Sequence, residues 1–376
     1  MQALTSLDPL ACVGALLTRP SVTPDDAGCQ QLIGEWLAPR GFTLRSMPFG
    51  DVNNLWACRG EGKPLVIFAG HTDVVPPGDT DRWEHPPFSA MQSNDYIHAR
   101  GAADMKGSIA AFLSALEAIE QQRGTLALLL TSDEEGPAVN GTARVVAQLK
   151  SEGVEADAIV IGEPTSRSRI ADCLRIGRRG SLSARITLVG KGGHVAYPDQ
   201  VRNPVHHAAD AITRLVAHRW DAGDADFPPT SMQFTSLTSD SGVGNVVPDQ
   251  IQLACNLRFS PATSVETIQR VFAETFAATG ISPEIEWNLS ARPFLGADGK
   301  LRRAAVKTIT SQCGYAPELS TAGGTSDGRF LIDLSPELIE LGPSNATIHQ
   351  VNERLAIAEL YKLRDIYADL FSRLLA

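Results

Sequence analysis

Short apolar runs alternate with helix-like segments through the first half of the chain, and this alternation restricts the fold more than any other feature. Three runs are apolar on both faces and long enough for one strand: PLVIFAG at 64–70, TLALLLTS at 125–132 and DAIVIGE at 157–163. Residues near 108–121 and 141–150 carry apolar side chains at helical spacing. Such an order is typical of a parallel sheet covered by helices. The sequence therefore predicts an α/β domain with a mainly parallel sheet and helices on both faces.

A different pattern fills residues 180–293. SLSARITLVG at 181–190 and IQLACNLRFS at 251–260 alternate apolar and polar residues, as strands with one exposed face do. The predicted order is strand, helix, strand, strand, helix, strand, at 181–189, 204–217, 231–237, 250–258, 264–278 and 283–289. This is the βαββαβ order of ferredoxin-like domains. We expect an inserted α+β domain at 180–293, which splits the first domain into 1–179 and 294–376.

The last part of the chain returns to the first pattern. ELIELG at 337–342 predicts one more buried strand, and apolar residues at helical spacing predict a closing helix over 355–375. At 376 residues, the chain is long enough for two domains with sizeable cores.

Charge and composition exclude several classes of function. The formal net charge of −10 argues against nucleic acid and anionic membrane surfaces as partners. No apolar run reaches the ~20 residues that span a membrane, and the first residues lack the basic and apolar pattern of a signal peptide. The six cysteines form no CxxC pair, which indicates reduced thiols in a cytoplasmic protein.

Each of the three strand candidates runs into residues that can bind a metal ion. His71 follows the first, Glu134 and Glu135 follow the second, and Glu163 follows the third. Ligands of open α/β sheets bind in the crevice beyond the carboxyl ends of the strands. We therefore expect these side chains to converge.

Two further candidates come from other segments. Asp104 lies at the expected start of a helix, and His349 lies in a loop after the strand expected at 337–342. One imidazole and one carboxylate for each ion, with one carboxylate and a water shared, make an environment that zinc accepts. The sequence thus predicts a hydrolase with a pair of divalent ions. The predicted ligands are His71, Asp104, Glu135, Glu163 and His349.

Two neighbouring acids have expected roles beside the ions. Asp73 can accept the other imidazole N–H of His71 and fix its tautomer. Glu134 is free to take a proton from water and return it to a leaving amine. Each candidate also has a structural explanation: Asp104 could cap a helix, and paired acids often form a solvated turn. Their shared placement on one face of the sheet favours a site.

Five separated motifs resemble the M20 family of metallopeptidases and deacylases: GHTDVVPPGD, RGAADMKGS, TSDEEG, GEPT and the late His349. The resemblance covers nearly the whole chain. It implies that Asp104 bridges two zinc ions, for which cobalt can substitute, and that Glu134 is the general acid and base. It assigns His71 with Glu163 to one ion and Glu135 with His349 to the other.

The resemblance also has implications for assembly. It implies a homodimer through the inserted domain, in which His194 reaches the partner's active site and helps to polarise the scissile carbonyl. On the sequence alone, His194 is better explained as a turn residue in the glycine-rich stretch GKGGHVAYP.

Within the family, GRRGSLS, GKGGHVAYP and GGTSDGRF are most similar to bacterial enzymes that remove succinate from N-succinyl-LL-2,6-diaminopimelate. This substrate carries three carboxylates, so arginine and amide donors are expected around it. The candidates are Arg178, Asn245, Arg258, Gly324, Thr325 and Asn345. We expect Arg178 and Gly324–Thr325 to hold the succinyl end and Arg258 the diaminopimelate end. A structural ion pair explains Arg258 equally well.

Other functions remain open. An acetylornithine deacetylase, an aminoacylase or a carboxypeptidase of the same family would keep the metal residues and differ in the pocket. A metal-binding protein without catalysis is the alternative from another class, and Glu134 argues against it because a closed structural site needs no free acid. Nucleotide binding is disfavoured because no GxGxxG or Walker loop follows the early strands.

Overall fold

The computed structural model describes residues 6–119, 123–239 and 242–376, and the chain divides into two compact units. The first unit consists of Met1–Gly177, Leu295–Ser320 and Ser326–Ala376. The second consists of Arg178–Phe294 and Thr321–Thr325. Among the described helices, none is long and apolar enough to cross a membrane.

An eight-stranded sheet forms the centre of the first unit, in the order β1-β2-β6-β3-β7-β18-β8-β17. β3 (Leu65–His71) pairs in parallel with β6 (Thr125–Thr131) and β7 (Ala158–Ile161), and β7 pairs in parallel with β18 (Leu338–Glu340). Towards the edges, antiparallel pairs join β1, β2 and β6 and join β18 to β8. The outer strands are β1 (Thr43–Ser46), β2 (Asn54–Gly60), β8 (Cys173–Arg175) and β17 (Glu318–Ser320). The predicted parallel sheet is confirmed at the centre.

Both faces of this sheet are buried. Val66 and Phe68 of β3 face a core shared with several helices, whereas Ile67 and Ala69 are buried on the opposite face. The helices of the shared core are α1 (Pro9–Leu17), α2 (Cys29–Leu37), α3 (Gly107–Ala115), α7 (Lys300–Cys313) and α9 (Ile357–Leu374). Outside that core, α4 (Thr142–Ser151) packs with α8 (Gly328–Leu331).

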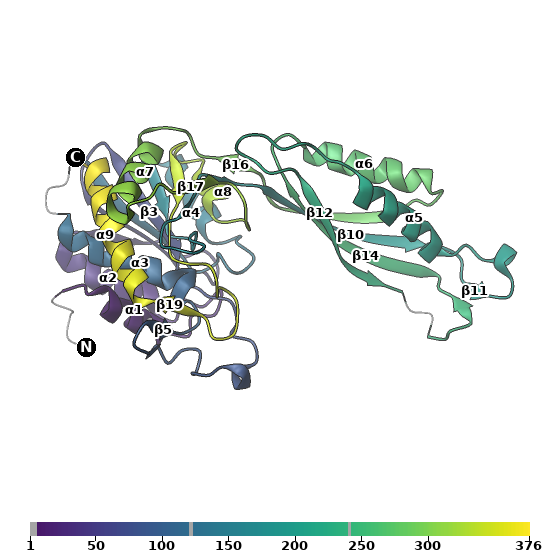
Figure 1. The fold of residues 1–376 in the computed structure, drawn as a ribbon, viewed down its shortest axis with the longest axis horizontal. Coiled ribbons are helices and arrows are strands. Elements are labelled where there is room, and N and C mark those ends of the chain that lie inside the picture. The colour runs from purple at the N-terminus through teal and green to yellow at the C-terminus, as the bar shows by residue number, and fades with distance from the viewer. Residues whose placement is uncertain (1–5, 120–122, 240–241) are drawn as a thin grey trace. The chain divides into compact units, whose positions relative to one another are not determined.

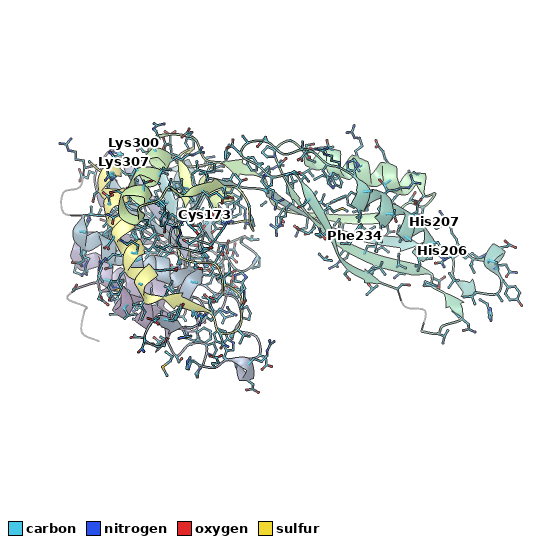
Figure 2. The ribbon with its side chains drawn as sticks, in the orientation of Figure 1. Cys173, His206, His207, Phe234, Lys300 and Lys307 are labelled. Atoms are coloured by element: carbon cyan, nitrogen blue, oxygen red, sulfur yellow. The ribbon has the colours of Figure 1, made fainter. Side chains whose placement is uncertain are left out.

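The expected helices are present, with local differences at their ends. The helix expected near 108–121 is α3 followed by a short turn at Leu116–Ala118, and residues 120–122 lie outside the described part of the chain. α7 shows why such helices form, because Leu301 and Ile309 are buried while Lys300 and Lys307 point outward (Figure 2).

The second unit contains a four-stranded antiparallel sheet with α5 (Pro204–Ala217) and α6 (Val265–Ala278) on one face (Figure 1). The strands are β10 (Gly180–Val189), β12 (Ser231–Thr238), β14 (Gln250–Phe259) and β15 (Glu284–Ala291), in the order β12-β14-β10-β15. Leu182 and Ile186 of β10 share a core with Leu215 and Phe272 of the helices. The predicted βαββαβ fold is confirmed.

Candidate metal centre

Three parallel strands of the first unit deliver acidic residues and an imidazole to one edge of the sheet. β6, β3 and β7 are neighbours, so their carboxyl ends lie side by side. His71 is the last residue of β3, Glu134 and Glu135 lie in the turn after β6, and Glu163 follows β7. The sheet thereby brings these side chains together.

Two imidazoles lie on either side of the Asp104 carboxylate. His71 Nε2 is 3.3 Å from Asp104 Oδ1, and His349 Nε2 is 3.3 Å from Asp104 Oδ2. His71 Nε2 also lies 3.8 Å from Glu163 Oε1, while His349 Nε2 lies 3.0 Å from Glu135 Oε1. Both imidazoles share Asp104, and each has a second carboxylate of its own. Two ions with one bridging carboxylate would need this arrangement.

Asp104 is placed by an irregular backbone rather than by a helix start. Its φ of −120° and ψ of 94° lie outside the helical region, and α3 begins only at Gly107. The expectation that Asp104 opens the helix is therefore corrected: the residue lies in the bend before it.

The donor atoms fit a divalent cation. His71 Nε2 and Asp104 Oδ1 are buried, and neither makes a hydrogen bond of good geometry with another described residue. Ligand atoms of His71, Asp104 and Glu135 lie within 4.8 Å of one another, as do those of His71, Glu134 and Glu163. Imidazole nitrogens and carboxylate oxygens are ligands that zinc accepts, and an ion would satisfy the buried atoms.

Burial and the charges of neighbouring groups shift the pKa values of these residues. Burial opposes a charged His71, but Asp104 and then Asp73 raise its pKa well above the usual value. Hydrogen bonds with Asp104 and Glu135 raise the pKa of His349 to about 10. Burial likewise opposes ionisation of Asp104, yet the two neighbouring imidazoles hold its pKa below its usual range. A bound cation would therefore compete with protons for these imidazole nitrogens.

Glu134 has a different environment from the paired carboxylates. Burial and then the charge of Glu163 raise the pKa of Glu134 well above its usual value. Asp327 adds to this effect, and burial raises the pKa of Asp327 itself to about 6. The three carboxyl groups line one small cavity. The sequence assigned no chemistry to Asp327, because an acid at a helix start is normally a cap.

The expected contact between Asp73 and His71 differs in detail. His71 Nδ1 lies 2.9 Å from the main-chain oxygen of Asp73 but 3.6 Å from its Oδ1. The Asp73 carboxylate instead accepts the N–H groups of Glu135 at 3.1 Å and Glu134 at 3.4 Å. The carbonyl therefore orients the imidazole, and the carboxylate holds the turn that carries the two glutamates.

His194 and Asn245 lie in one corner of the second unit. β11 (Gly193–His194) pairs with β13 (Val246–Val247), and the Val195 N–H donates to the main-chain oxygen of Asn245 at 3.1 Å. His194 Nδ1 accepts the Ala196 N–H at 3.1 Å, so the proton of the neutral ring lies on Nε2.

Two predicted arginines are neighbours in the second unit. Arg178 is buried and donates to the main-chain oxygen of Ala322 at 3.3 Å. Arg258 lies on β14, and its buried Nη1 has no hydrogen-bond partner among the described residues. Burial and then the charge of Arg178 lower the pKa of Arg258. Adjacent guanidinium groups of this kind favour an anionic ligand.

The remaining predicted substrate-binding residues belong to different units. Gly324 and Thr325 belong to the second unit. Asn345 belongs to the first, where its N–H donates to Ser166 O at 3.0 Å.

Residues 67–373 match the sequence profile of peptidase family M20/M25/M40. The chain belongs to this family. It is 48% identical over 372 residues to a succinyl-diaminopimelate desuccinylase of Alkalilimnicola ehrlichii, covering 98% of this chain and 99% of that protein. A protein of the same name from Halorhodospira halophila is 47% identical over 365 residues, covering 96% and 97%. This similarity spans both units.

Solved structures share the fold at low sequence identity. An M20 metallo-carboxypeptidase from Sulfolobus solfataricus has a TM-score of 0.81 at 17% identity, covering 97% of this chain and 98% of that one. A dinuclear metal-binding M20 peptidase from Bacillus subtilis has a TM-score of 0.73 at 16% identity, covering 98% and 97%.

Zinc is expected to raise the melting temperature of the protein by roughly 5–11 °C. An ion at 100 times its Kd stabilises the folded state by about 2.7 kcal/mol, and larger proteins gain roughly 2–4 °C for each kcal/mol. Thermal scans of chelator-treated protein with and without added Zn²⁺ measure the shift. Asp104→Asn is the control and should shift less. An unchanged melting temperature of the parent protein would contradict a metal centre here.

Proposed function

We propose that the chain is a di-zinc hydrolase that removes succinate from N-succinyl-LL-2,6-diaminopimelate, in the route to lysine and cell-wall precursors. The observation that carries the proposal is the shared Asp104 between two imidazole and carboxylate sets, in a chain similar over its full length to succinyl-diaminopimelate desuccinylases. Six free cysteines support a location in the reducing cytoplasm.

The chemistry follows from the positions of Glu134 and its neighbours. Two zinc ions, held by His71 with Glu163 and by His349 with Glu135 around Asp104, would polarise the amide carbonyl and acidify a water. Glu134 takes a proton from the water, and the oxygen of the water attacks the amide carbon at the same time. The same carboxyl then gives the proton to the nitrogen as the C–N bond breaks, which releases succinate and the free amine. The Glu134 carboxyl lies beside His71 and Glu163, which is the position that such a proton transfer requires.

In this proposal, guanidinium, amide and main-chain groups recognise the substrate. Arg178 and Gly324–Thr325 hold the succinyl carboxylate, and Arg258 holds a carboxylate of the diaminopimelate end. Asn245 and Asn345 add amide donors. The pair of neighbouring arginines supports this role, because a substrate with several carboxylates needs cationic partners in an otherwise acidic protein.

The proposal includes a homodimer through the second unit. β12 is an edge strand of the four-stranded sheet, and its sequence SMQFTSLT carries no charge or proline that would block pairing with another chain. Phe234 comes from this strand (Figure 2), and Leu237 is 54% exposed on it. In the dimer, His194 donates its Nε2 proton to the substrate carbonyl in the partner's site.

The purified protein with zinc is expected to hydrolyse succinyl-diaminopimelate in preference to acetylornithine and to a dipeptide. Glu134→Gln should lower kcat by at least 100-fold with zinc still bound, because general acid–base groups contribute about 10²–10⁴-fold. Amine release and metal content are measured together. Preference for acetylornithine would overturn the assigned substrate, and full activity of Glu134→Gln would overturn the mechanism.

Arg258→Ala is expected to raise KM by at least tenfold without changing the bound zinc. Hydrogen bonds to charged groups contribute about 1.5–3 kcal/mol, which corresponds to a factor of roughly 10–100. Steady-state kinetics measure the change, and Arg185→Ala, an exposed arginine on β10, is the matched control. An unaltered KM would remove Arg258 from the substrate site.

Leu237→Asp is expected to convert the dimer to monomers at micromolar concentration, because a charge on an edge strand opposes pairing. Sedimentation velocity measures the mass. Leu319→Asp, on the exposed edge strand β17 of the first unit, should remain a dimer. If both variants behave as the parent protein does, the β12 edge is not the interface. The monomeric variant should also be less active than the dimer, because His194 no longer reaches the active site of a partner.

A further inference from the structure

Glu353 is a fully buried carboxylate that accepts four hydrogen bonds from one loop. Its Oε2 accepts Arg100 Nη1 at 2.7 Å and Gly101 N at 3.1 Å, and its Oε1 accepts Ala103 N at 3.0 Å and Asp104 N at 3.2 Å. A buried carboxylate is costly unless its lone pairs are used, and here each oxygen has two donors. All four donors belong to the loop that carries Asp104.

This loop needs an acceptor from elsewhere in the chain. The backbone at Asp104 and Met105 departs from helical angles, so the segment before α3 is not a regular helical turn. The N–H groups of Ala103 and Asp104 lie at the start of that segment, where a helix would leave such groups without internal partners. Glu353 satisfies both of them with a single oxygen. The carboxylate therefore fixes the peptide that immediately precedes the side chain of Asp104.

Glu353 also belongs to the segment that carries His349. Thr347 and Arg354 close the base of this segment, because the Arg354 N–H donates to Thr347 Oγ1 at 3.2 Å and Thr347 Oγ1 donates to Arg354 O at 3.2 Å. The main-chain oxygen of Glu353 accepts the Ala99 N–H at 3.1 Å. The loops of Asp104 and His349 are thus joined through one residue, by its main chain and its side chain.

We propose that Glu353 is a positioning residue of the metal centre, which holds the Asp104 loop and the His349 segment in one arrangement. Through these bonds, Oδ2 of Asp104 faces His349 while Oδ1 faces His71. The role involves no contact between Glu353 and an ion and no proton transfer. It rests on the proposed metal centre, because it requires Asp104 and His349 to be ligands.

Glu353→Gln tests the role with little change of shape. The glutamine places an NH₂ group where one oxygen stood, so two of the four donors meet another donor and the loop must shift. We expect the affinity for Co²⁺ to fall by at least tenfold, as is typical when the partners of a metal site are lost. We also expect the visible spectrum of the cobalt-loaded protein to change, since it reports the ligand geometry. Titration followed by absorption measures both.

Glu337→Gln is the matched control. Glu337 also accepts two main-chain N–H groups, those of Lys300 and Leu301, but these lie at the start of α7 and not in a loop that carries a proposed ligand. It should lose thermal stability while keeping the cobalt affinity and spectrum of the parent protein. If Glu353→Gln also keeps both, and only its melting temperature falls, Glu353 is merely structural and the inference is overturned.

Glu353→Asp covers the case in which Glu353→Gln does not fold. It keeps the charge but draws the carboxylate back by one methylene, which lengthens all four bonds. A weaker cobalt affinity and an altered spectrum of Glu353→Asp would support the role, and parent-like values would overturn it. If the parent protein itself binds no Co²⁺ or Zn²⁺, the proposed function fails instead, so the two failures are distinguishable.

Discussion

Repulsion between closely spaced carboxylates is the main physical constraint on the site of the first unit. Asp104, Glu135 and Glu163 lie within a few ångströms of two imidazoles, and Glu134 joins His71 and Glu163 in the same crevice. Two like charges 4 Å apart cost about 4 kcal/mol at an effective dielectric constant of 20. Burial and this repulsion raise the pKa of Glu134, and the nearby carboxylates raise the pKa of His349 to about 10. Bound divalent cations would offset the same repulsion, so ion binding and stability are linked.

Two further carboxylates accept hydrogen bonds from main-chain N–H groups and so hold the loops that carry these charged residues. Asp73 holds the turn of Glu134 and Glu135, and Glu353 holds the loop of Asp104. Main-chain donors bind the Asp73 carboxylate, and the Glu353 carboxylate adds an ion pair with the buried Arg100 to its three main-chain donors. The surrounding carboxylates can therefore fix the geometry without competing for the position of an ion.

Much of this arrangement could be predicted from the sequence, because buried parallel strands have a strong apolar pattern and their carboxyl ends meet at one edge. His71, Glu135 and Glu163 were found in that way. Asp327 and Glu353 were not, since their partners are far away along the chain and each looks locally like an ordinary acid near a helix or a strand. The hydrogen bond of His71 to the Asp73 carbonyl also depends on how the chain turns after β3, which residue spacing does not determine.

The residues of the proposed metal centre come from chain segments on both sides of the inserted unit in the sequence. His71, Asp104, Glu135 and Glu163 precede the insertion, whereas His349 and Glu353 follow it. β18 enters the sheet beside β7 and leads into the loop of His349, and β19 (Arg354–Ala356) pairs with β5 (Tyr96–His98) immediately before the Asp104 loop. The proposed ligand set of His349 and Glu135 is therefore complete only when the last part of the chain has joined both strands. Since Glu353 lies at that junction, the contacts that complete the fold of the first unit are the same ones that bring His349 to Asp104.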